Sequence, residues 1–243
     1  MNLDVLKINV NFNGRESVIH PVFLHNSSEK ILIDAGFPGT LPLIEDAVKA
    51  LGLSLEGLNA IIITHSDIDH IGGLHELKEK YPSAKVYSSE IEAQYISGKE
   101  KPIRLQYYEN NSTLLSDAQK QWMSNIKGMF KFLKYVPVDI TFPKDESPNY
   151  FEDVEIIHTP GHLPGHISVY VKDKKILISG DAITVNNGEL DINTTATIDL
   201  KTAIQSIKKL LSYEINEIVC YHGGVLKGNI RENINKLINK YDK

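Results

Sequence analysis

Two histidines and two aspartates stand close together in residues 64–73, which read THSDIDHIGG. His65, Asp67 and Asp69 alternate, so their side chains begin on the same side of an extended segment, and His70 follows in the turn after them. Imidazole and carboxylate groups are ligands of divalent zinc, iron and manganese. The alternative is a solvated polar turn whose aspartates cap a helix. This density of ligand-type groups after an apolar run favours a metal site.

Polar segments also follow three later runs that are expected to be strands. These segments are TPGH at 159–162, GD at 180–181 and YHGG at 221–224. Each is weak by itself, because a single histidine after a strand is more often a structural residue. Strand ends are rigid and open onto the edge of a sheet, where sites are usually built. Together the four segments predict one site.

The elements that must position these segments alternate between strand and helix. The run NAIIIT at 59–64 is typical of a strand buried on both faces, and the apolar spacing of 41–51 predicts a helix. KILI occurs at 30–33 and again at 175–178, which suggests two related halves. Strands interleaved with helices in two halves predict an α/β sandwich. Further strands are expected at 5–12, 17–24, 84–87, 138–142, 154–158, 167–171 and 216–221, and further helices from Ile71 and at 199–211 and 230–238.

The middle of the chain has a different pattern. Apolar residues recur every three to four positions between Leu114 and Leu133, which predicts an amphipathic helix of about twenty residues. One interpretation is packing against the core. The other is a helical insertion at about 98–137, in which Trp122, Met129 and Phe130 wall a substrate pocket or the segment forms a homodimer contact.

Composition excludes several classes of partner. The chain has 243 residues, 42% of them hydrophobic, and a net charge of −5, so it suits one domain over 1–243 and is a poor binder of nucleic acid. Cys220 is the lone cysteine and is expected in the core. No signal-like start and no run of ~18 apolar residues is present, so we expect a cytoplasmic protein with a small-molecule substrate and no membrane partner.

In their order along the chain, these motifs resemble the metallo-β-lactamase-fold hydrolase superfamily. Its run T-H-x-H-x-D-H precedes a glycine pair, a T-P-G-H loop, a G-D after a strand and a late histidine, and LIDAG at 32–36 resembles its second strand. The resemblance covers residues ~17 to ~225 and implies a four-layer αβ/βα sandwich with a metal site at one edge. Asp67 departs from the pattern, because the motif here is H-x-D-x-D-H in place of H-x-H-x-D-H.

Carried over residue by residue, the resemblance implies two metal clusters with a bridge between them. The implied ligands are His65, Asp67 and His162 for the first ion, Asp69, His70 and His222 for the second, and Asp181 as the bridge. The implied cofactors are two divalent metal ions, zinc foremost. Iron or manganese is the alternative at the first cluster, since Asp67 makes it a set of two histidines and one carboxylate.

The resemblance also implies a reaction. A metal-bridging hydroxide would cleave an ester, lactone or thioester, and Asp69 would orient it and pass a proton to the leaving group. The superfamily leaves other reactions open, namely those of a mononuclear iron oxidoreductase similar to a persulfide dioxygenase, and of a phosphodiesterase. Lactonases of this family place a tyrosine shortly after the bridging aspartate, whereas Ala182, Ile183 and Thr184 stand here.

Two further residues have alternative interpretations. Asp34 would hydrogen-bond a ligand histidine from behind, or it is a carboxylate of a turn. His166 would lie beside the site, or it stabilises its loop. The remaining histidines are expected to be structural or on the surface; they are His20, His25, His75 and His158.

Overall fold

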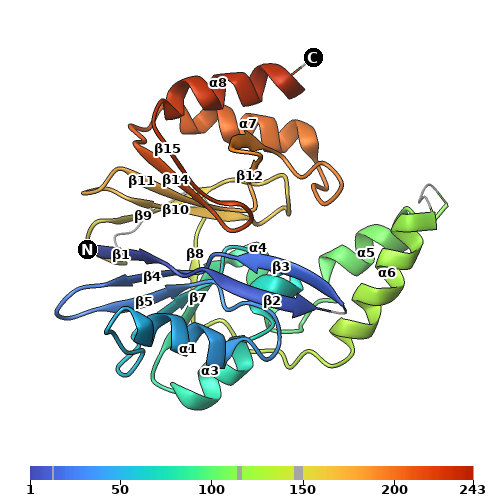
Figure 1. Cartoon of the computed structure of the whole chain (residues 1–243). Coiled ribbons are helices and arrows are strands. Elements are labelled where there is room, and N and C mark those ends of the chain that lie inside the picture. Colours follow the sequence, from blue (N-terminus) through green and yellow to red (C-terminus); the bar gives the residue numbers. More distant parts are fainter. Residues whose placement is uncertain (13, 114–116, 145–149, 243) are drawn as a thin grey trace.

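The computed structural model describes residues 1–12, 14–113, 117–144 and 150–242. Two large β-sheets lie face to face, and helices cover the outer face of each (Figure 1). The layers therefore follow the order helix, sheet, sheet, helix. This is the four-layer αβ/βα sandwich that the sequence predicts.

The first sheet contains six strands in the order β1-β4-β5-β6-β7-β8. Their bounds are β1 (Asn2–Val5), β4 (Val22–His25), β5 (Lys30–Ile33), β6 (Ala60–Ile62), β7 (Lys85–Ser89) and β8 (Ile140–Phe142). The helices α1 (Leu41–Ala50) and α3 (Leu74–Lys80) lie on its outer face (Figure 1), and α4 (Glu90–Ile96) follows β7.

The second sheet contains five strands in the order β15-β14-β11-β10-β9. Their bounds are β9 (Val154–His158), β10 (Ile167–Val171), β11 (Ile176–Gly180), β14 (Glu217–Cys220) and β15 (Gly224–Lys227). The helices α7 (Leu200–Leu210) and α8 (Ile230–Tyr241) cover it on the opposite side of the molecule (Figure 1).

The two KILI segments occupy equivalent places in the two sheets. β5 pairs antiparallel with β4 and parallel with β6, and β11 pairs antiparallel with β10 and parallel with β14. Each KILI strand thus pairs antiparallel with the strand before it, and parallel with a later strand that follows a crossover connection. The polar segments that follow β6, β9, β11 and β14 come together at one edge of the sandwich.

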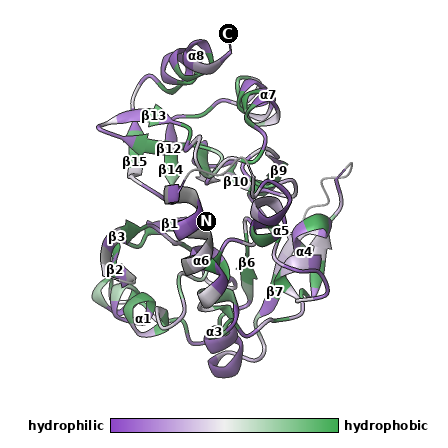
Figure 2. Cartoon of the chain, turned by 90° about the vertical axis from the view of Figure 1, so that its right-hand side faces the viewer, coloured by the Kyte–Doolittle hydropathy of each residue, from purple (hydrophilic) through white to green (hydrophobic). Residues whose placement is uncertain are grey.

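Burial on both faces explains the continuous apolar runs. Leu32 and Ile61 pack in the core beneath the helices of the first sheet, whereas Ile33 and Ile62 pack in the core between the two sheets. A third core joins the second sheet to α7 and α8. The covering helices carry both hydrophilic and hydrophobic residues, as α1, α7 and α8 show in Figure 2. This fits helices with one buried and one exposed face.

Two long strands expected from the sequence are each divided in the structure. The run 5–12 becomes β1 and β2 (Ile8–Phe12), and the run 17–24 becomes β3 (Arg15–Ile19) and β4, with β2 and β3 paired in a hairpin of their own. Pro21 lies at the division and has no N–H to continue the ladder. Its carbonyl instead accepts a hydrogen bond from Leu6 N–H at 2.9 Å. A second small hairpin, β12 (Thr184–Asn186) with β13 (Glu189–Asp191), was not expected.

The predicted helix of about twenty residues is wrong in length. The structure has α5 (Ile103–Asn110) and a separate α6 (Asp117–Phe130) of 14 residues, while Leu114 and Leu115 lie outside the described residues. The apolar spacing of the sequence did not predict α5. Its buried residues are Arg104, Leu105 and Tyr108, and their burial depends on tertiary contacts. The two helices stand out from the side of the sandwich (Figure 1). Every helix in the described ranges is too short or too polar to span a bilayer.

Candidate metal centre

The structure brings together every metal ligand expected from the sequence. They come from four segments that each follow a strand of one of the two sheets. His65 and Asp67 follow β6, Asp69 and His70 lie on α2 (Ile68–Ile71), His162 follows β9, Asp181 follows β11, and His222 lies between β14 and β15. That these residues bind metal stays a prediction.

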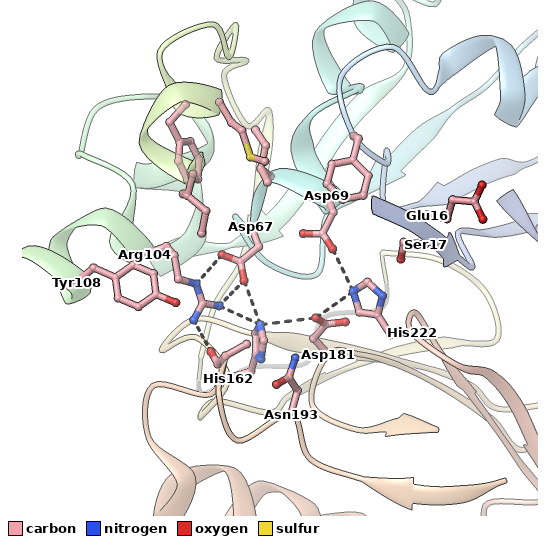
Figure 3. Close-up of a pocket in the computed structure, with 16 residues that line it drawn as sticks. Glu16, Ser17, Asp67, Asp69, Arg104, Tyr108, His162, Asp181, Asn193 and His222 are labelled. Carbon is pink, nitrogen blue, oxygen red and sulfur yellow. Dashed lines mark hydrogen bonds and ion pairs between the residues drawn. The ribbon is translucent and has the colours of Figure 1, made fainter. Parts of the chain in front are cut away.

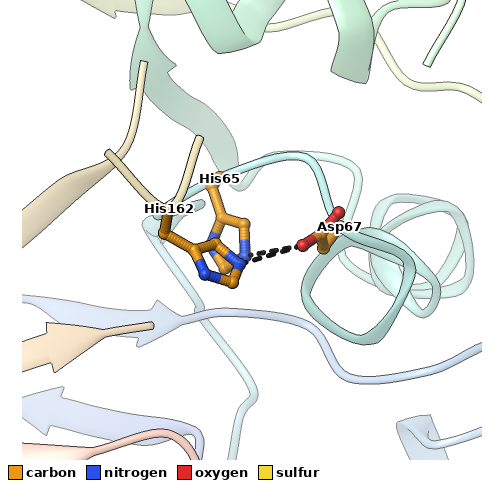
Figure 4. A group of neighbouring side chains, drawn as sticks. All are labelled: His65, Asp67 and His162. Carbon is orange, nitrogen blue, oxygen red and sulfur yellow. Dashed lines mark hydrogen bonds and ion pairs between the residues drawn. The ribbon is translucent and has the colours of Figure 1, made fainter. Parts of the chain in front are cut away.

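The first expected cluster consists of His65, Asp67 and His162, whose side chains point toward one another (Figure 4). Asp67 Oδ2 lies 3.0 Å from Nε2 of His162 and 3.4 Å from Nε2 of His65. His65 and His162 are fully buried, whereas Asp67 is partly exposed to a cavity.

The second expected cluster consists of Asp69, His70 and His222. Asp69 Oδ2 lies 3.0 Å from Nε2 of His222 and 3.8 Å from Nε2 of His70. Although burial opposes it, the carboxylates of Asp181 and Asp69 raise the pKa of His222 to about 9. The neighbouring carboxylates therefore favour a positive charge at this place.

Asp181 lies between the two clusters (Figure 3). Its Oδ1 is 3.5 Å from Nε2 of His70, and its Oδ2 is 3.5 Å from Nε2 of His222 and 3.7 Å from Nε2 of His162. Oδ1 thus faces the second cluster, whereas Oδ2 faces histidines of both clusters. The carboxylate therefore lies where it could contact an ion in either cluster.

Several atoms of the centre are buried without a hydrogen-bond partner in the described part of the chain. They are Nε2 of His65, Nε2 of His70, Nδ1 of His162 and Oδ1 of Asp181. An unpaired buried polar group costs about 1–3 kcal/mol, so native structures rarely leave several together. Three of these residues, His65, His70 and Asp181, form one group of ligand-type side chains that fits a divalent metal ion. Nδ1 of His162 points elsewhere, because Nε2 of that ring faces Asp67.

Asp34 orients His70 from behind, as one of its two interpretations proposed. Its Oδ2 lies 2.9 Å from Nδ1 of His70, and its Oδ1 accepts a hydrogen bond from Thr64 N–H at 2.9 Å. A proton on Nδ1 leaves the Nε2 lone pair of His70 directed into the centre. Tyr221 supports the same residue, because the two rings lie 3.9 Å apart and the tyrosine hydroxyl donates to the Asp69 carbonyl.

His166 positions the backbone of Asp181. Its Nε2 accepts a hydrogen bond from Asp181 N–H at 3.0 Å, so Nδ1 carries the proton and donates to Thr159 Oγ1 at 2.9 Å. Burial holds the pKa of His166 well below its usual range, which keeps it neutral for this role. Gly180 allows the close approach, because its φ is +52° and a Cβ there would lie 2.8 Å from His166 Nε2.

Glu92 is a site residue that the sequence did not indicate. This fully buried carboxylate on α4 accepts hydrogen bonds from Ser66 N–H and Gly165 N–H, both at 2.9 Å. It therefore ties the loop of His65 and Asp67 to the loop that follows His162. Burial raises the pKa of Glu92 to about 7. No sequence signal could have singled it out, since most helical glutamates are exposed.

Arg104 is the second residue that sequence reasoning missed. It enters the centre from α5, and its side chain is only 5% exposed. Nε donates to Asp67 Oδ1 at 3.0 Å, Nη2 donates to Asp67 Oδ2, and Nη2 lies 3.1 Å from Nε2 of His162 (Figure 3). Although burial opposes it, the guanidinium holds the pKa of Asp67 well below its usual range.

The remaining candidates lie away from the metal-ligand groups. Cys220 packs in the core of the second sheet, where burial raises the pKa of its thiol to about 12. His20 contacts the Tyr221 carbonyl, His25 contacts Asp4, and His75 contacts Glu79. These contacts agree with structural or surface roles.

A cavity of about 370 Å³ opens above the centre. Asp67, Asp69 and Asp181 lie along it, and Ile126, Met129 and Phe130 of α6 form an apolar wall. Phe130 is also buried in the core of the first sheet, so α6 both packs against the core and lines the cavity. A role of α6 in substrate binding or in a homodimer contact stays a prediction. The side chain of Trp122 lies outside the described residues.

Comparison of the sequence with known proteins identifies the family. The model of the metallo-beta-lactamase superfamily matches residues 15–222. A probable metallo-hydrolase of Bacillus subtilis, YflN, is 32% identical over 86% of this chain and 81% of its own. The hydroxyacylglutathione hydrolase GloC of Haemophilus influenzae is 24% identical over 79% of this chain and 78% of its own.

A solved structure supports the fold. A metallo-beta-lactamase family protein from Thermus thermophilus aligns with a TM-score of 0.71 at 18% identity, over 99% of this chain and 79% of that one. The family match spans the segments that supply His65, Asp181 and His222. The chain therefore belongs to the metallo-beta-lactamase superfamily, and the centre described above occupies the edge of that fold.

Proposed function

We propose that this protein is a metal-dependent hydrolase that cleaves an ester, lactone or thioester bond in a small molecule. The observation that carries the proposal is the convergence of buried, unpaired imidazole and carboxylate atoms at the base of a cavity with an apolar wall. The relatives named as a probable metallo-hydrolase and as a hydroxyacylglutathione hydrolase support a hydrolytic reaction.

The expected clusters would hold two divalent ions, with Asp181 between them. Zinc is the foremost candidate, with iron or manganese as alternatives where Asp67 contributes. Bound metal would supply a Lewis acid and lower the pKa of water to near ~7, so that a nucleophile is present at neutral pH. The protein's own part is to hold the ligand set and to exclude competing reactions.

Asp69 is the residue that we assign to proton transfer. It lies along the cavity, and its Oδ2 contacts His222 at 3.0 Å. Its second oxygen can accept a proton from the attacking water and pass it to the leaving group. Because the Tyr221 hydroxyl anchors the Asp69 backbone, this carboxylate stays oriented during both transfers.

The cavity supports a small, partly apolar substrate. Ile126, Met129 and Phe130 would contact its apolar part, while the reacting carbonyl lies toward Asp69 and Asp181. A net charge of −5 does not suit a nucleic-acid substrate. A cytoplasmic location and a homodimer stay predictions.

The test is a panel of esters, lactones, thioesters, phosphodiesters and a persulfide, assayed with protein freed of metal and then supplied with zinc, manganese or iron(II). We expect carbonyl-ester or thioester hydrolysis that needs added metal and is abolished by a chelator. Asp69→Asn lacks the carboxylate that transfers the proton, so it should lose most turnover even at metal concentrations that restore its metal content. Oxidation of a persulfide by the one-iron form, or no hydrolysis by any form with bound metal, would contradict the proposal.

A further inference from the structure

Arg104 uses the same lone pairs that a metal ion in the first cluster would need. Its Nη2 group lies against both Asp67 Oδ2 and His162 Nε2, while Nε donates to Asp67 Oδ1. Both oxygens of Asp67 are thereby engaged by one planar guanidinium, the bidentate arrangement that arginine and carboxylate favour. Nε2 of His162 faces the same group.

The guanidinium is built into the fold at this place. Arg104 is only 5% exposed, and its Nη1 donates to the backbone carbonyl of Ala196. The neighbouring Leu105 and Tyr108 of α5 are buried too. To leave Asp67, Arg104 would have to break all of these contacts inside a region of low dielectric.

The other ligands are arranged differently. In the described ranges, the ion pairs of Asp69 and Asp181 are formed with histidines alone. Nε2 of His65, Nε2 of His70 and Oδ1 of Asp181 have no hydrogen-bond partner there, and these three residues form a metal-ligand group of their own. A metal ion can therefore reach this group without displacing a cation.

We propose that Arg104 is the resident cation of the first cluster and competes there with a metal ion for Asp67 and His162. The protein then binds one divalent ion tightly, through His65, His70 and Asp181 with Asp69 and His222 beside them. A second ion binds much more weakly, because it must displace Arg104 or bind against its positive charge. The inference rests on the metal requirement of the proposed function, but not on which bond is cleaved.

The experiment is a titration of the metal-free full-length protein with Zn²⁺ in the presence of a chromophoric chelator. We compare the wild type with Arg104→Met, which removes the charge at similar length, and with Arg231→Met, which alters an exposed arginine that bonds the Leu211 carbonyl. In the wild type and in R231M, the second ion should bind at least about tenfold more weakly than the first. In R104M, the second ion should gain at least about tenfold in affinity.

Two ions bound with equal affinity by the wild type would overturn the proposal. An affinity of the second ion that is the same in R104M as in the wild type would overturn it too. If R104M does not fold, Arg104→Lys provides the second variant, because lysine keeps the charge but lacks the planar fork. The second ion should then bind more tightly to R104K than to the wild type. An unchanged affinity of the second ion overturns the proposal.

These constants are measured without substrate, so the two proposals can fail separately. Absence of hydrolysis, with unequal metal affinities that depend on Arg104, would refute only the proposed function. Hydrolysis by a protein that binds two ions with equal affinity would refute only the proposed role of Arg104.

Discussion

Asp34 lies 2.9 Å from His70 Nδ1 and adopts a backbone φ of 64°, a left-handed conformation that directs its carboxylate behind the metal centre. Asparagine tolerates this conformation, so Asp34→Asn tests the charge with little backbone strain. We expect about a 10- to 100-fold loss of metal affinity, since the carboxylate fixes the His70 tautomer. Competition titration against a chelator measures the change. Asp46→Asn, at an exposed position on α1, is the control, and equal affinities in both variants would contradict this role.

Glu92 should make the stability of the metal-free protein depend on pH. Its folded pKa is raised to about 7 from 4.5, so the folded state binds the proton more tightly than the unfolded chain. This contribution is full below the unfolded pKa and is lost as the pH rises through the folded one, a change on the order of 3 kcal/mol. Glu92→Gln cannot titrate.

Denaturant unfolding between about pH 5 and about pH 8 tests this expectation. The wild type should lose more unfolding free energy over that interval than Glu92→Gln. The exposed Glu90 of the same helix provides the control variant Glu90→Gln, which should follow the wild type. Parallel curves for the wild type and Glu92→Gln would show that this carboxyl does not titrate in the interval.

Asp181 should be required by both clusters, because its two oxygens face histidines of each. Asp181→Asn keeps the shape but removes the charge. We expect reduced metal content by elemental analysis and at least about a hundredfold loss of turnover. Asp117→Asn, at an exposed residue of α6, should leave both unchanged. A D181N protein that keeps its metal and its activity would rule out the bridging role.

Substitutions of Met129 and Phe130 should separate the two roles of α6, which are lining the cavity and packing against the core. Met129 is half-buried and lines the cavity, so Met129→Ala should alter KM and acyl-group preference at small cost in stability. Phe130 is 6% exposed and packs in the core, so Phe130→Ala should cost about 3–5 kcal/mol. Phe132, which is 82% exposed, provides the control Phe132→Ala. Thermal melts measure the stability of each variant, and kinetics measure its KM and acyl-group preference. An unchanged substrate preference in M129A would show that Met129 does not contact the substrate.

Asp67→His changes the motif to H-x-H-x-D-H, the pattern that the sequence resembles. The variant should lose the partner of Arg104 and gain an imidazole ligand, so it should bind two ions and prefer zinc over manganese. Asp67→Ala should not bind a second ion tightly, because its first cluster retains only two ligands. Metal analysis after dialysis against mixed metals measures both. Identical metal content in the wild type, D67A and D67H would make Asp67 a residue of the turn only.

Local patterns determined much of this protein. The apolar runs predicted the inner strands, because residues buried on both faces cannot be polar, and KILI marked the equivalent strands of the two sheets. The ligand types of His65, Asp69 and His70 could be read from adjacent positions, since a strand end and the turn after it set their directions. The segments with His162, Asp181 and His222 could be placed at strand ends from the sequence. Their assignment to particular clusters needed the family resemblance, because they are far apart in the chain.

The charges that contact the candidate ligands depend on long-range packing. Arg104 reaches Asp67 across 37 positions, and Glu92 joins Ser66 to Gly165 across 26 and 73 positions. Neither residue has a local signature, because arginine and glutamate on a helix are ordinarily solvated. Their burial depends on how α4 and α5 pack against loops from both sheets. Local patterns therefore predict the fold and the types of the candidate ligands. Long-range packing places the Arg104 guanidinium beside Asp67 and the Glu92 carboxylate between the two loops.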